Sequence, residues 1–128
     1  MDNERAASIT IAGKEYQLIL TTRATKEIAK RYGGLANLGD KLMKTENFEL
    51  ALDELIWLIA LLANQSILIH NFQHPEDKRE PLTEEEIELL TTPTDLAEYK
   101  DAIMDSMLRG TKRNVESEPQ PEKNASAG

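Results

Sequence analysis

The chain contains no cysteine, and this absence removes several kinds of site at once. Disulfide bonds, thiolate nucleophiles and zinc sites with cysteine ligands are all excluded. Aromatic residues are also scarce, with one Trp, three Tyr and two Phe among 128 residues. The core must therefore be built from aliphatic side chains, mainly Leu, Ile and Ala. This composition favours helices over a β-sandwich or barrel.

Basic residues are outnumbered by acidic ones, and the formal net charge is −8. An acidic surface repels both nucleic-acid phosphates and anionic lipids. The most apolar run, residues 55–63, has polar neighbours on both sides and is too short to span a bilayer. The start of the chain is polar and carries acidic residues, which is not typical of a signal peptide. We therefore expect neither nucleic acid nor a membrane as a partner.

No set of residues forms a recognisable catalytic, cofactor or metal site. His70 and His74 have the spacing of a helical metal site, but Asn71 stands where a metallopeptidase would have Glu. The glutamates within residues 84–88 lie at a helix start, where solvent and the helix dipole stabilise their charges. Alternatively, these glutamates form a contact patch for a basic partner. Catalytic carboxylates instead need unlike environments. Gly33-Gly34 lacks the residues of a phosphate loop. We predict a protein that is not an enzyme and has no metal or cofactor.

Alternation of apolar and polar residues predicts a β-hairpin at the start of the chain, from about Ser8 to Leu20, around a turn that contains Gly13. Helical periodicity follows it. The sequence predicts a mainly α fold in which a short N-terminal β-hairpin precedes four to five helices that pack around a long central helix. The expected helices cover residues 22–32, 35–42, 48–72, 84–90 and 93–109.

Helix-capping signals define several of these boundaries. Thr83 and Glu86 form a capping box, and a second Thr cap is followed by Pro93 at the first helical position. Gly110 is expected to end the last helix. We therefore predict a flexible lead-in at 1–7, a single α-rich domain at 8–110 and a disordered polar tail at 111–128.

The central helix is apolar almost all round, which is more than the rest of this small chain obviously covers. Trp57 in its middle is either a core residue or an interface anchor. Methionines on the last helix would adapt to varied partners. The surplus of apolar surface predicts a protein partner or self-association. The predicted partner-binding residues are Trp57, Leu58, Leu61, Leu62, Met104, Met107 and Leu108.

The order of these elements resembles the tail assembly chaperones of long-tailed bacteriophages and prophages of low-GC Gram-positive bacteria. The resemblance covers about residues 8–110. It is carried by the hairpin, the helix that ends at Gly33-Gly34, the long apolar helix, the segment Leu82-Thr-Glu-Glu-Glu-Ile87, the last amphipathic helix and the polar tail.

The resemblance implies a specific role and location. Such proteins bind the tape measure protein, keep it soluble and help bring tail tube subunits to it, without enzymatic activity or a cofactor. They act in the cytoplasm of the bacterial host and are absent from the mature virion. Many have a longer product made by ribosomal frameshifting, and a run of adenines encoding Lys123-Asn124 would provide a slippage site. The alternatives are a small phage-borne adaptor or regulatory protein that binds one folded partner, and a minor virion connector.

Overall fold

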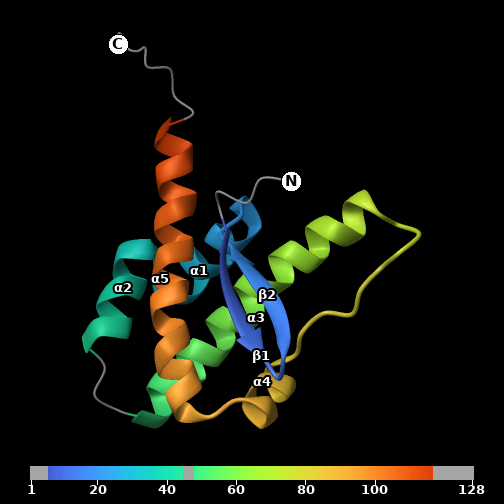
Figure 1. Ribbon diagram of the computed structural model, residues 1–128. Coiled ribbons are helices and arrows are strands. Elements are labelled where there is room, and N and C mark those ends of the chain that lie inside the picture. Colours follow the sequence, from blue (N-terminus) through green and yellow to red (C-terminus); the bar gives the residue numbers. More distant parts are fainter. Residues whose placement is uncertain (1–5, 45–47, 117–128) are drawn as a thin grey trace, which may run out of the picture.

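The computed structural model describes residues 6–44 and 48–116, with side-chain surroundings for 7–38, 40, 41 and 51–110 (Figure 1). These residues confirm the predicted mainly α fold with an N-terminal hairpin. The elements in chain order are β1 (Ala6–Ile11), β2 (Lys14–Ile19), α1 (Thr22–Tyr32), α2 (Leu35–Lys44), α3 (Phe48–Gln73), α4 (Glu84–Leu90) and α5 (Pro93–Glu116).

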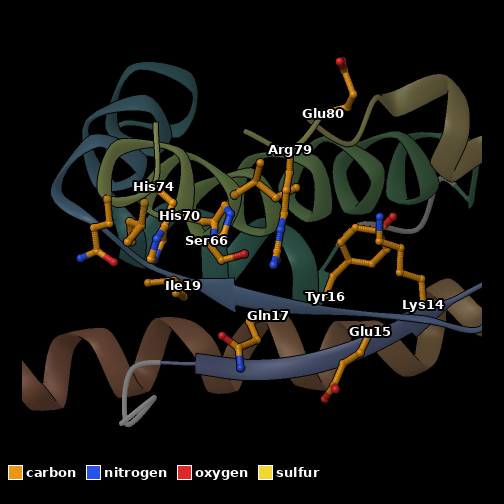
Figure 2. Close-up of a pocket in the computed structure, with 13 residues that line it drawn as sticks. Lys14, Glu15, Tyr16, Gln17, Ile19, Ser66, His70, His74, Arg79 and Glu80 are labelled. Carbon is orange, nitrogen blue, oxygen red and sulfur yellow. The ribbon is translucent and has the colours of Figure 1, made fainter. Parts of the chain in front are cut away.

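The two strands form an antiparallel hairpin that closes through a two-residue turn. Ile11 pairs with Lys14, and the residues between them, Ala12 and Gly13, have φ values of 52° and 80°. Two positive φ angles match the twist of a tight hairpin. β2 runs beside α3 (Figure 2), and apolar side chains on one face of the hairpin, including Ile9 and Leu18, are buried.

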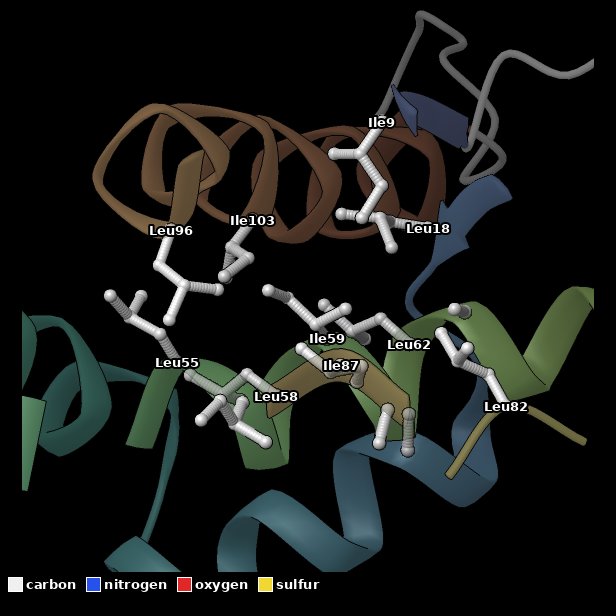
Figure 3. Packing of buried hydrophobic residues seen from close by; sticks show 14 of the residues in the cluster. Ile9, Leu18, Leu55, Leu58, Ile59, Leu62, Leu82, Ile87, Leu96 and Ile103 are labelled. Carbon is white, nitrogen blue, oxygen red and sulfur yellow. The ribbon is translucent and has the colours of Figure 1, made fainter. Parts of the chain in front are cut away.

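The core is built around α3, which contacts β2, α1, α4 and α5. Figure 3 shows aliphatic side chains of α3 between those of the hairpin, α5 and the segment around α4. Periodic Leu and Ile positions supply this packing because neighbours three and four residues apart share a helix face. The labelled core residues are Ile9, Leu18, Leu55, Leu58, Ile59, Leu62, Leu82, Ile87, Leu96 and Ile103.

α5 holds the hairpin through backbone carbonyl groups as well as apolar contacts. The Ser106 hydroxyl, fully buried, donates a hydrogen bond to the Leu18 carbonyl at 2.9 Å. The Tyr99 hydroxyl donates to the Thr10 carbonyl at 2.5 Å, and burial, with Asp95 and Glu98 nearby, raises the pKa of Tyr99. An isolated two-stranded hairpin is marginal in water. These contacts therefore supply support that the hairpin needs.

The N-terminal caps predicted for the helices that begin after Thr83 and at Pro93 are confirmed. Thr21 caps α1, which ends at Gly33 in the left-handed conformation with φ 86°. Thr83 and Glu86 form the capping box of α4. At α5, the Thr92 hydroxyl accepts a hydrogen bond from the Asp95 amide, and the Asp95 carboxylate accepts one from the Thr92 amide.

The predicted end of the last helix was wrong. Gly110 lies within α5, which continues to Glu116 and so enters the segment predicted as tail. A Cβ at position 110 would lie 2.9 Å from the Leu20 Cβ, so glycine here permits close packing instead of ending the helix. β1 likewise begins at Ala6, inside the predicted lead-in. The frameshift site at Lys123-Asn124 and the remaining tail lie outside the described residues.

The apolar part of α3 is longer than the run at residues 55–63 indicated. Ala51–Gln73 is long and apolar enough to cross a bilayer by length and composition alone. The apolar run predicted from the sequence ended before the polar pair Asn64 and Gln65. The prediction that the apolar segment is too short to span a bilayer was therefore wrong. Half of the most apolar 18-residue segment of this helix is buried within the fold. The core helix of a folded domain meets the same criterion of length and composition.

Candidate protein-binding surfaces

Three of the seven predicted partner-binding residues belong to the core. Leu58 and Leu62 of α3 have no exposed surface, and Met107 of α5 is 7% exposed. The prediction that they face a partner was wrong, because the hairpin, α4 and α5 together cover more of α3 than the apolar pattern indicated.

The other four residues lie on two separate helices. Trp57 and Leu61 are half-buried on α3, whereas Met104 is half-buried and Leu108 is 64% exposed on α5. Met104 and Leu108 are four residues apart and share one face of α5. The accessible part of the predicted partner-binding set is therefore a short apolar row on α5 and a separate stripe on α3.

Trp57 is covered by the end of α1. The Arg31 guanidinium carbon lies 4.4 Å from the centre of one Trp57 ring, and the Tyr32 ring meets Trp57 edge-on, with centroids 5.9 Å apart. Arg31 Nε lies 3.3 Å from the Glu54 carboxylate, which also accepts a hydrogen bond from the Tyr32 hydroxyl. Glu54 is buried, and these donors compensate its desolvation. Trp57 thus joins α1 to α3 and is not a free interface anchor.

The stripe that contains Leu61 continues beyond the cover of α1. Leu68 and Phe72 follow Leu61 by seven and eleven residues, which places them on the same side of the helix. α1 begins beside Gln65, where the Thr21 hydroxyl donates to the Gln65 side-chain oxygen at 2.5 Å. Past this point the stripe is open, with Leu68 38% and Phe72 89% exposed.

The open stripe forms the floor of a groove, here called the α3 groove, of about 870 Å³. Its walls are the start of α1, including Arg23, and the loop after α3, including Pro75 and Lys78. Arg23 and Lys78 are its charged lining residues, and both are basic. The groove was not predicted from the sequence, because the spacing of Leu68 and Phe72 from Leu61 shows that they share one side of the helix but not that this side is open.

The loop wall is attached to α3 by two asparagine side chains. The Asn64 amide donates to the Leu82 carbonyl at 2.8 Å and accepts from the Leu82 N–H at 2.7 Å. Asn71 makes the same pair of bonds with the backbone of Arg79, at 3.0 and 2.8 Å. These paired bonds hold the loop alongside α3.

The two histidines face a second cavity, of about 400 Å³, between β2 and α3 (Figure 2). Their ring centroids are 4.8 Å apart, and His70 Nε2 lies 2.8 Å from the Asp77 carbonyl oxygen. Within the described residues, no three His, Asp or Glu side chains are placed to share a metal ion. The contacts of His70 join the loop to α3.

α4 presents a surface whose charge is opposite to that of the α3 groove. Ile87 is buried and anchors the helix, whereas Leu89 and Leu90 are 75% and 51% exposed. Glu84, Glu85 and Glu88 are exposed beside them. α4 therefore combines an uncovered leucine pair with carboxylates in solvent.

Comparisons with known proteins identify no relative of this chain. No protein-family model matches it, and neither a curated protein nor a solved structure matches it. A functional proposal therefore depends on these surfaces and on the resemblance of residues 8–110.

Proposed function

We propose that the chain is a phage tail assembly chaperone, which binds the tape measure protein, keeps it soluble and helps recruit tail tube subunits. One observation carries the proposal: a small domain with a well-packed core leaves large apolar side chains open on three helices. On each helix these side chains form a local apolar patch, in α5 together with the half-buried Met104, and contiguous apolar patches mark binding sites. These exposed residues are Leu68, Phe72, Leu89, Leu90 and Leu108.

The binding face that we propose for the tape measure protein is the apolar row of Met104 and Leu108 on α5. This row is the part of the predicted partner surface on α5 that remains accessible. A long helical protein with apolar stripes would pack along such a row, because residues three and four apart form ridges that fit a second helix. The thioether of Met104 would adapt to differing segments of that helix.

Co-expression with the tape measure protein tests this role. We expect the intact chain to increase the soluble fraction of the long protein several-fold. Leu108→Asp is expected to lose most of that increase, because it places a charge in the proposed apolar contact. Leu89→Asp is the matched control, since it makes the same change at an exposed leucine on α4.

Two results would contradict these statements separately. If the intact chain leaves the solubility of the tape measure protein unchanged, the proposed function is wrong. If Leu108→Asp and Leu89→Asp act equally, the α5 binding face is wrong. Detection of the chain in purified particles would instead support a minor virion connector.

A further inference from the structure

The α3 groove and α4 are complementary in both apolar character and charge. The groove has Leu68 and Phe72 on its floor and basic residues in its walls. α4 has two exposed leucines with carboxylates beside them. In a chain of net charge −8, a groove whose charged lining is wholly basic is an unusual local environment.

The basic groups near the groove are available for a partner. Arg23 and Lys78 line it, and Lys26 lies one turn along α1 from Arg23. Within the described part of the chain, none of these three makes an ion pair, whereas Lys30 is 3.6 Å from Glu27.

The carboxylates of α4 are equally available. Glu86 is held in the capping box of the helix by Thr83. Glu84, Glu85 and Glu88 make no ion pair with any described residue. A short helix with an apolar pair and three free carboxylates is a suitable occupant for an apolar groove with basic walls.

We propose that α4 of one copy of the chain docks in the α3 groove of a second copy. Leu89 and Leu90 would cover Leu68 and Phe72, and the free carboxylates would lie near Arg23 and Lys78. In Figure 1, α4 is at the bottom of the molecule and the last turns of α3 are at the upper right, so one copy does not fill its own groove. The inference concerns copies of this chain alone and does not depend on the proposed function.

Because the two contacting surfaces differ, two arrangements satisfy the contact. Copies related by a two-fold axis exchange both contacts and close as a dimer, whereas copies joined head to tail leave one groove and one α4 open and continue to associate. Salt screens attraction between solvent-exposed charges over a Debye length of roughly 10 Å at 0.1 M. The association is therefore expected to weaken as ionic strength rises.

Sedimentation velocity of the full chain over a range of concentrations tests the proposal. The intact chain should form dimers or larger species, and Phe72→Glu or Leu89→Glu should each leave it monomeric. An equimolar mixture of these two variants should form a species of two chains, because each supplies the surface that the other lacks. Leu108→Glu is the matched control, an exposed leucine outside both surfaces, and should associate as the intact chain does.

Several outcomes would overturn the proposal. These are an intact chain that stays monomeric at all concentrations, a mixture that does not associate, or loss of association in Leu108→Glu. A closed dimer that Phe72→Glu abolishes and Leu89→Glu preserves would show that two grooves meet instead. Circular dichroism of each variant confirms folding, and Arg23→Glu replaces Phe72→Glu if that variant is unfolded.

Discussion

The two parts of α3 share one apolar stripe but have different surroundings. From Ala51 to Gln65 the helix lies under the hairpin, α1, α4 and α5, and Leu58 and Ile59 have no exposed surface. From Ser66 to Gln73, one side faces β2 across the second cavity, while Leu68 and Phe72 are open. The cover ends where α1 begins, beside Gln65. The apolar residues of a helix therefore indicate how much of its surface is to be buried. The neighbouring elements determine which of these residues are buried and which stay exposed.

Alanine substitution of one leucine in each part should reveal this difference most strongly. Leu58→Ala creates a cavity in the core and should lower the free energy of unfolding by about 3 kcal/mol. Leu68→Ala should lower it by about 1 kcal/mol or less, because its side chain already meets solvent. Urea denaturation measures both values. Equal losses would mean that the second part of the stripe is buried in solution.

Features that depend on neighbours in sequence were predicted correctly. Thr83 and Glu86 are three residues apart, so the pattern of their capping box is evident in the sequence itself. The role of Gly110 was misjudged because its constraint comes from Leu20, which is distant in sequence. Local patterns identify caps and turns, whereas close packing between distant segments depends on the complete fold.

The binding surfaces were predicted less well for a related reason. Leu58 and Leu62 were assigned to a partner because periodicity does not reveal how many elements surround a helix. Leu68 and Phe72 were missed because their exposure depends on where α1 begins relative to α3. Leu108 and Met104 are accessible, as a partner surface requires, whereas Met107 was predicted from the same local pattern on α5 and is buried. Surface assignment thus requires the positions of the covering elements.

The two aromatic residues of the stripe offer a second test of the comparison. Trp57→Ala removes the edge-on contact with Tyr32 and the surface beneath Arg31, and should cost about 2 kcal/mol of stability. Phe72→Ala should change stability by about 0.5 kcal/mol or less, because Phe72 is almost fully exposed. Thermal unfolding of both variants measures the difference. A large loss for Phe72→Ala, measured in dilute monomer, would contradict an open groove.

The paired hydrogen bonds of Asn64 and Asn71 give the third and smallest contrast. Asn64→Ala leaves the amide and carbonyl of the buried Leu82 without their partners, and should cost about 1.5 kcal/mol. Asn71→Ala should cost about 0.5 kcal/mol, because the exposed backbone of Arg79 can bond to water instead.

Hydrogen exchange distinguishes the two asparagines even where their stability effects are close. In the Asn71→Ala variant the Arg79 amide should exchange faster while the Leu82 amide stays protected, because the loop is released only near the groove. In the Asn64→Ala variant the Leu82 amide should lose protection. If each variant released both amides equally, the loop would behave as one unit. The wall of the α3 groove would then depend on Asn64 as much as on Asn71. The difference between the covered and the open part of α3 would have no counterpart in the stability of the loop beside them.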